Sequence, residues 1–200
     1  MPSAIEIPRE IREEFFRLKQ ENQALSEELL RLRQTMRSLV KLQNRLESIT
    51  PDSDPRELID LILRTALEAV NSYNGSLMLL DDKTNDLVFV HVIGVAKDNL
   101  LNYRLPAGQG IAHWVVASRN PRLVLDARSE PLFSPQVDQL TGFLTISLIC
   151  VPLYHNERTL GALEVVNTAS GEPFKQEDVD ILQLVARLAT LAILKAEGNA

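Results

Sequence analysis

Apolar residues recur along the first fifty positions with alternating steps of four and three. One series is Ile11, Leu18, Leu25, Leu32, Leu39 and Leu46, and the second is Phe15, Asn22, Leu29, Met36 and Gln43. A repeat of 3.5 residues sustained for about five heptads is typical of a left-handed coiled coil. The pattern predicts a coiled-coil helix over residues 9–50, after an N-terminal tail over 1–8. The alternative is one amphipathic helix packed on a domain, which usually has a broader apolar stripe.

The flanking charges favour a parallel homodimer. Glutamates occupy one flank at heptad position g, and Arg12, Lys19 and Arg33 occupy the other at position e. A parallel pair sets Glu14 against Lys19 of the second helix, whereas an antiparallel pair brings like charges together. Asn22, at an inward position, is suited to fixing a two-stranded register. The expected dimer contacts are Ile11, Phe15, Leu18, Asn22, Leu25, Leu29, Leu32, Met36, Leu39 and Leu46.

A break separates this helix from a globular region. Pro51 and Pro55 do not fit a helix interior, so residues 51–54 are assigned to a linker. Asp54 is a suitable cap for a new helix that begins at Pro55. The domain is expected over 55–196, with a C-terminal tail over 197–200.

The pattern beyond residue 55 predicts an α+β fold. Alternating and β-branched runs predict strands at 75–81, 87–93, 145–154 and 159–167, the last two forming a hairpin. Helices are expected from Pro55 to about Val70, from Ile111 to Ser118 and from Phe174 onward. Helices at both ends of an antiparallel sheet should pack together on one face of that sheet.

Composition narrows the functional class. Hydrophobic residues make up 45% and charged residues 24%, as in ordinary globular proteins. The net charge of −6 argues against a dedicated nucleic-acid-binding protein. The single cysteine, Cys150, excludes an internal disulfide. Because the chain has neither a signal-peptide pattern nor a membrane-length apolar run, we expect it to be cytoplasmic, without membrane contact.

Four sequence blocks carry a resemblance to a known family. They are GSLMLLDD, RLPAGQGIAHWVVASRNP, PLFSPQVDQLTGFLTISLICVPL with TLGALEVVN, and PFKQEDVDIL. Together they resemble the GAF domain family of small-molecule sensors over residues 55 to about 195. The resemblance implies a GAF-like antiparallel sheet and a non-enzymatic signalling module with no required cofactor. The implied partners are a small-molecule ligand, a second copy of the chain and an unidentified effector protein.

The third block is similar to the cyclic-nucleotide-binding branch of that family, found in phosphodiesterases and bacterial adenylate cyclases. The branch pattern is matched at Val137, Asp138, Thr141, Gly142, Phe143, Thr145, Cys150 and Pro152. A second marker is matched at Asn167, Phe174 and Asp178. Thr168 and Val179 replace its lysine and glutamate, so its lysine–aspartate pair cannot form.

The resemblance also implies a set of ligand-binding residues. They are Ser76, Val92, Ile93, Ile111, Ala112, Ser134, Thr141, Thr145 and Glu164. Val92 and Ile93 stand where some cGMP-binding relatives have an aromatic residue and an aspartate. A bound nucleotide is therefore expected to be cAMP rather than cGMP, while another small molecule or no ligand remains open.

Each candidate also has a plainer structural interpretation. Thr141 and Thr145 suit a loop cap as well as a ligand contact, and Gly108–Gly110 suits a simple turn. Glu164, on an otherwise apolar strand face, needs a ligand, a protein cation or an exposed edge. We interpret Cys150 as a small buried hydrophobe. The rival to a sensor is a structural adaptor whose pocket no longer binds a ligand.

Overall fold

The computed structural model describes residues 8–48 and 54–198. Outside the described ranges lie residues 1–7 of the predicted tail, 49–50 of the predicted coiled-coil helix, 51–53 of the predicted linker and the last two residues. The described helices are α1 Arg9–Glu47, α2 Pro55–Ala69, α3 Lys97–Leu100, α4 Gly110–Ser118, α5 Gln136–Thr141 and α6 Gln176–Ala196. The strands are β1 Ser72–Leu80, β2 Leu87–Ile93, β3 Arg104–Leu105, β4 Arg122–Val124, β5 Leu148–His155 and β6 Arg158–Thr168.

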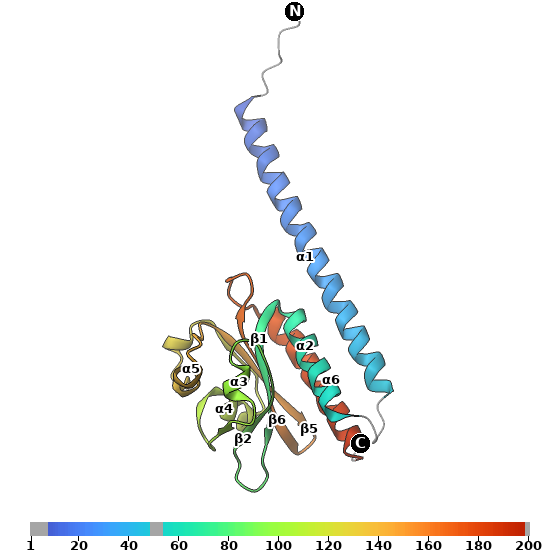
Figure 1. The fold of residues 1–200 in the computed structure, drawn as a ribbon. Coiled ribbons are helices and arrows are strands. Elements are labelled where there is room, and N and C mark those ends of the chain that lie inside the picture. Colours follow the sequence, from blue (N-terminus) through green and yellow to red (C-terminus); the bar gives the residue numbers. More distant parts are fainter. Residues whose placement is uncertain (1–7, 49–53, 199–200) are drawn as a thin grey trace, which may run out of the picture.

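The domain has one six-stranded antiparallel sheet with helices on both faces. The strand order is β3-β2-β1-β6-β5-β4, so β1, β6 and β5 lie at the centre. The helices α2 and α6 cover one face, and the short helices α3, α4 and α5 lie over the other (Figure 1). This confirms the predicted α+β class with terminal helices on one face of an antiparallel sheet.

Side-chain alternation gives the domain two cores. On the α2 and α6 side, Leu77, Leu163 and Val165 pack beneath the two helices and are fully buried. On the opposite side, Met78, Cys150 and Ala162 face the short helices and are also buried. Adjacent residues of β1 and β6 therefore belong to different cores, as expected for strands with a period of two.

Local hydrogen bonds move two strand boundaries from their expected positions. The first strand begins at Ser72 rather than Gly75, because Ser72 and Asn74 already pair with β6 in the β1–β6 ladder. The hairpin strand begins at Leu148 rather than residue 145. The amides of residues 145–147 donate to the side chains of Asp138 and Asn167 instead of to a neighbouring strand.

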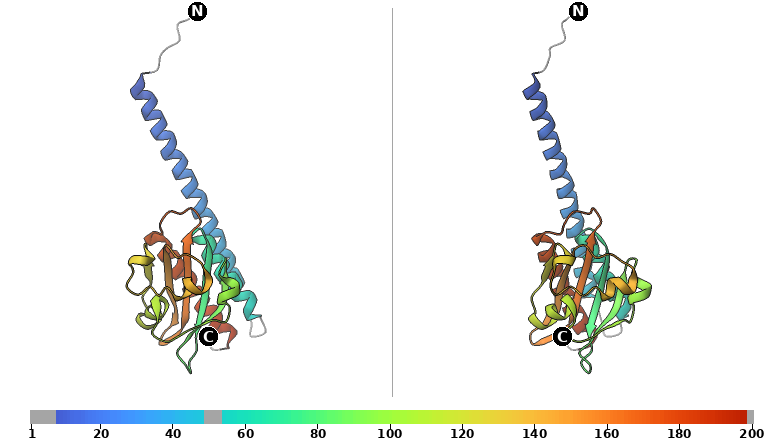
Figure 2. Two further views of the ribbon diagram at one scale, coloured as in Figure 1. Left: turned by 60° about the vertical axis from the view of Figure 1, so that its left-hand side comes forward. Right: turned by 90° about the vertical axis from the view of Figure 1, so that its left-hand side faces the viewer.

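The helix α1 has two unlike halves. Its C-terminal half packs on α2 and α6, while its N-terminal half extends beyond the domain (Figures 1 and 2). Leu42 is fully buried against the α2 and α6 core. The Thr35 hydroxyl donates to the carbonyl of Ala69 at 3.3 Å, and the Ser38 hydroxyl donates to the Glu68 carboxylate at 2.8 Å.

Two predicted dimer contacts have partners within the chain. Leu39 and Leu46 pack against the core of their own domain, beside the buried Leu42. This differs from their assignment to a seam between two chains. A repeat of three and four residues shows that a helix buries a stripe, but it does not identify the partner helix. The other assigned residues are exposed along α1, including Phe15 at 68% and Met36 at 66%.

An ion pair also connects α1 to the start of α6. The Arg31 guanidinium lies 3.4 Å from the Asp178 carboxylate, which accepts the backbone N–H of Lys175 at 2.8 Å. Asp178 thus caps α6 while it holds α1. In the family marker a lysine stands at the position of Thr168. In this chain the cation beside Asp178 is instead Arg31 of α1.

Candidate functional site

A row of side chains crosses the sheet beneath the short helices. Ser76 on β1 lies opposite Val92 on β2 and Glu164 on β6, and Glu164 lies opposite Cys150 on β5. Residues directly opposite one another in a ladder point to the same face. Ser76, Val92 and Cys150 are buried, so Glu164 lies in the middle of a row whose other members are buried.

Two adjoining cavities lie over this row. Their volumes are about 60 and about 50 Å³, and both are lined by Phe89, Val137, Thr145 and Glu164. The first is also lined by Ile111, Ala112 and Ser134, and the second by Ser76, Val92, Ile93 and Thr141. The fold thus gathers all nine candidates around one place, and their contact with a ligand remains a prediction.

The cavities are small in this conformation. Pockets for drug-sized ligands usually measure about 300 to 1,000 Å³, several times either cavity. One or two water molecules would fill each of them, since water takes up about 30 Å³ in the liquid. Any larger ligand requires the segments above the sheet to move outward.

Asp138 holds the segment that closes the cavities. Its carboxylate accepts the backbone N–H and the hydroxyl of Thr145, at 3.0 and 2.6 Å, and pairs with Arg128 at 2.7 Å. The side chain of Asn167 binds the same segment, accepting from Ile146 N at 2.8 Å and donating to Leu144 O at 2.9 Å. These bonds fix Thr145 above Glu164.

Both candidate threonine hydroxyls have protein partners. Thr141 donates to the carbonyl of Val137 at 2.8 Å and accepts from the N–H of Phe143 at 3.1 Å. Thr145 donates to Asp138. The capping interpretation therefore accounts for Thr141, and each hydroxyl keeps only acceptor capacity for a ligand.

Glu164 is the exception among the acidic groups of the site. Among the described residues, none forms a hydrogen bond or an ion pair with its carboxyl group. Burial, and secondarily the nearby charge of Asp138, raise the pKa of Glu164 from 4.5 to about 7. The residue keeps an intermediate exposure, since its side chain faces both cavities. An unpaired carboxyl in this position costs stability whenever it is ionised.

The cysteine and two of the histidines are buried or bound to other protein groups. Cys150 is fully buried, and burial followed by the charge of Glu164 raises the pKa of its thiol, which fits the buried-hydrophobe interpretation. His113 Nε2 lies 3.2 Å from the carbonyl of Leu105, and His91 Nε2 lies 3.0 Å from Asp60. No group of three or more potential metal ligands occurs in the part of the chain that is described.

Several wall residues were not assigned from the sequence. Phe89, Phe133 and Phe143 form much of the apolar wall, and Asp138 organises it. Isolated aromatic residues in strands and loops look like ordinary core positions, so they give no separate signal. Asp138 had one, because it belongs to the VDQLTGF run that carries the resemblance.

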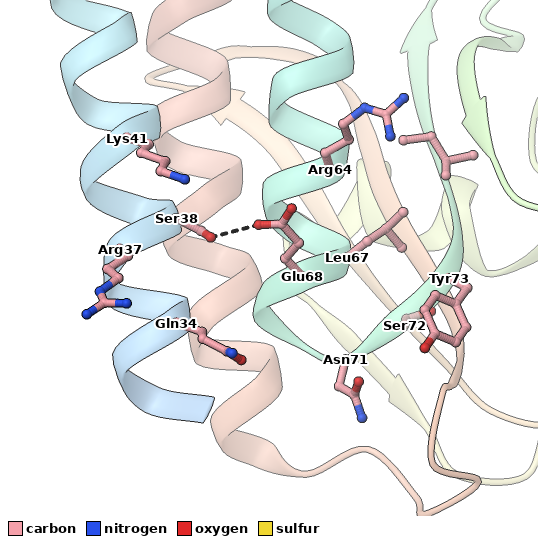
Figure 3. A pocket seen from close by; sticks show the side chains of 11 residues that line it. Gln34, Arg37, Ser38, Lys41, Arg64, Leu67, Glu68, Asn71, Ser72 and Tyr73 are labelled. Carbon is pink, nitrogen blue, oxygen red and sulfur yellow. Dashed lines mark hydrogen bonds between the residues drawn. The ribbon is translucent and has the colours of Figure 1, made fainter. Parts of the chain in front are cut away.

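A larger hollow of about 600 Å³ lies elsewhere, between α1, α2 and the start of β1 (Figure 3). The Ser38–Glu68 hydrogen bond crosses it, and Arg37 points away from α2. Arg64 is bound to Asp60 at 2.6 Å. The hollow is an open groove beside the docked half of α1.

Comparisons with known proteins agree with this architecture. The family model described as GAF domain matches residues 52–194. A dual 3′,5′-cyclic-AMP and -GMP phosphodiesterase 11A from Takifugu rubripes is 31% identical over 96 residues, which are 47% of this chain and 11% of that protein. The chain therefore spans only a small part of this curated relative.

Solved structures share the fold. The GAF domain of a phosphoenolpyruvate-protein phosphotransferase from Coxiella burnetii matches with a TM-score of 0.68 and 19% identity, covering 84% of this chain and 98% of that chain. A free methionine-R-sulfoxide reductase from Neisseria meningitidis matches with a TM-score of 0.67 and 19% identity, covering 83% of this chain and 92% of that chain.

No described helix is long and apolar enough to cross a membrane.

The raised pKa of Glu164 predicts a pH-dependent stability. Since the folded-state pKa of about 7 exceeds the ordinary 4.5, the folded protein binds more protons between these values. Stability should then fall as pH rises through this window, by at most about 3 kcal/mol. Glu164→Gln removes this loss, so its stability advantage over the unmodified chain should grow from about pH 5 to about pH 8.

Urea unfolding at both pH values measures this difference. Glu157→Gln is the matched control, because the Glu157 side chain is 99% exposed. An advantage of Glu164→Gln that is equal at both pH values, or equal to that of the control, would contradict the account.

Proposed function

The chain belongs to the GAF domain family, whose members are small-molecule-sensing signalling modules, and from this premise we propose that it binds a ligand in the cavities around Glu164. The carrying observation is the partly buried position of a carboxyl group that is unpaired among the described residues and lies among candidate ligand contacts. Small-molecule sites are typically apolar hollows with a few converging polar groups. This site has that composition, with Glu164, Ser76 and Ser134 among apolar walls.

The strand β6 connects the cavities to the helices on which α1 is docked. Glu164 faces the cavities, while its neighbours Leu163 and Val165 pack on the opposite side beneath α2 and α6. The helix α1 is docked on those same two helices by Leu42 and by the Arg31–Asp178 ion pair. We propose that a shift of β6 on ligand binding alters this docking. Spatial continuity supports the route, and coupling needs its own measurement.

A cyclic nucleotide is the finer form of the proposal. It is supported by the resemblance of the TGF-containing run and by the similarity to a relative named as a dual cyclic-AMP and -GMP phosphodiesterase. The apolar side chains of Val92 and Ile93 offer no hydrogen bond to a guanine edge, so we favour cAMP over cGMP. Binding either nucleotide requires the cavities to open.

A structural adaptor is the second candidate, and the small cavities favour it. If the segment held by Asp138 does not move outward, the cavities stay too small for a drug-sized ligand. The protein would then act through its surfaces, including the exposed apolar stripe of α1. Binding of any small molecule in the cavities separates the two candidates.

We further propose that α1 forms a parallel homodimer. Its exposed stripe from Ile11 to Met36 needs a partner, since exposed contiguous apolar surface usually marks an interaction site. Leu184 and Leu191, each 45% exposed, offer additional apolar surface on α6, a helix that α1 contacts. The dimer would leave Leu39 and Leu46 in their contacts within each chain.

Thermal unfolding with cAMP, cGMP and AMP tests ligand binding. A ligand at a hundred times its Kd stabilises by about 2.7 kcal/mol, which raises the Tm by several degrees. We expect cAMP to give the largest rise. Ala112→Leu, which fills a cavity wall, should abolish it, whereas Ala117→Leu on the exposed side of α4 should preserve it.

The same samples decide between sensor and adaptor. No Tm change with any compound, together with no bound small molecule in native mass spectrometry, would reject ligand sensing. A rise of equal size in Ala112→Leu would place binding outside these cavities.

Light scattering at micromolar concentration tests the dimer. We expect the mass of two chains for the unmodified protein, and of one chain for Leu25→Glu, because a charge in the seam is costly. Leu30→Glu is the matched control, since Leu30 is exposed but lies outside the assigned seam. A monomeric unmodified chain would refute the proposal, as would equal effects of the two variants.

A further inference from the structure

The polar groups of the two cavities differ in whether the protein satisfies them. Asp138, Thr141 and Thr145 have the hydrogen bonds described above, and Asn74 accepts the N–H of Val95 at 3.3 Å. Among the described residues, none forms a hydrogen bond with the side chains of Ser76, Ser134 or Glu164. These three groups therefore remain available to a ligand, as does the Nδ2 group of Asn74, and Glu164 is the one that can carry a charge.

The charges around the cavities are one-sided. Of the described residues that line them, none is a lysine, arginine or histidine, whereas two are acids. Asp138 has its countercharge in Arg128, 2.7 Å away. Glu164 has none. A buried carboxylate is strongly stabilised by a cation that also donates hydrogen bonds to it.

The position of Ser76 adds directionality. Ser76 lies directly opposite Glu164 in the β1–β6 ladder, and both line the same cavity. A ligand nitrogen with several N–H groups can donate to the carboxylate and to the serine oxygen from one position. The walls formed by Phe89, Val92 and Val137 suit an apolar body attached to that nitrogen.

Resting on the ligand-binding function proposed above, but in place of its cyclic-nucleotide form, we propose that the ligand carries a positively charged nitrogen group that binds the Glu164 carboxylate. The group is an ammonium, amidinium or guanidinium attached to an apolar body. An anionic group at this end of the site would face the carboxylate of Glu164, which is not paired with any cation among the described residues. The proposal assigns the specificity of this end to Glu164.

Three probes of equal size test the charge preference: ethylammonium chloride, ethanol and sodium formate, each with three non-hydrogen atoms. Probes this small can be tested against the cavities as they stand. Their affinities cannot be much tighter than about millimolar, so amide NMR titration is the suitable measurement. We expect saturable shifts at the amides of Ser76, Ile111 and Thr145 with ethylammonium, and weak or no shifts with the other two.

Substitutions test the assignment to Glu164. Glu164→Gln keeps the shape and removes the charge, so ethylammonium should bind about tenfold or more weakly. Glu164→Asp keeps the charge and should retain part of the binding, and Glu157→Gln should bind like the unmodified chain. The amide spectrum of each variant shows whether it is folded, and Glu164→Asp remains informative if Glu164→Gln is not.

The outcomes separate this inference from the broader function. Equal binding of formate or ethanol, unchanged binding in Glu164→Gln, or no binding of ethylammonium would overturn the cationic-ligand proposal. If a nucleotide binds in the cavities while ethylammonium does not, the sensing function stands and this inference fails. If nothing binds in the cavities, both fail.

Discussion

The strand β6 is the constraint on which the arrangement depends. It lies between β1 and β5 at the centre of the sheet, and its side chains alternate between two cores. At Gly161 any Cβ would collide with the backbone of Met78, so the central strands can approach closely only with glycine there. Glu164 thus cannot turn away from the cavities without moving Leu163 and Val165 out from beneath α2 and α6.

This geometry explains how the fold accommodates the Glu164 carboxyl, which lowers the stability of the folded state when it is ionised. The Glu164 carboxyl is only partly exposed, and the closing segment is held by Asp138 and Asn167 rather than by Glu164. The hydrogen bonds that hold this segment do not involve the Glu164 carboxyl. Such unsatisfied groups are costly in stability and tend to occur at functional sites, where a partner completes them.

Much of the fold follows from sequence pattern, and the misses have physical causes. Strong alternation located the hairpin strands, and Asp54 with Pro55 located the start of α2, where Asp54 accepts the N–H of Arg56 at 2.8 Å. The four-residue helix α3 has too little pattern to detect. The heptad of α1 predicted a long helix but not its docking, because Leu42 needs the surface of α2 and α6 to explain its burial.

The candidate site was predictable in place but not in chemistry. The run containing Thr141 and Thr145 identified the cavity wall, yet both hydroxyls turned out to serve the protein. Whether a polar side chain is satisfied depends on how separate segments of the chain meet. Asp138 is paired with Arg128, whereas Glu164 has no partner among the described residues. Only the folded arrangement shows that difference.

The most direct test of this account is a titration of the Glu164 carboxyl followed by carbon NMR in the ligand-free protein. The account predicts a pKa of about 7 for this group. A pKa near the ordinary 4.5 would contradict it, because it would mean that the carboxyl is well hydrated or already has a partner that stabilises its charged form.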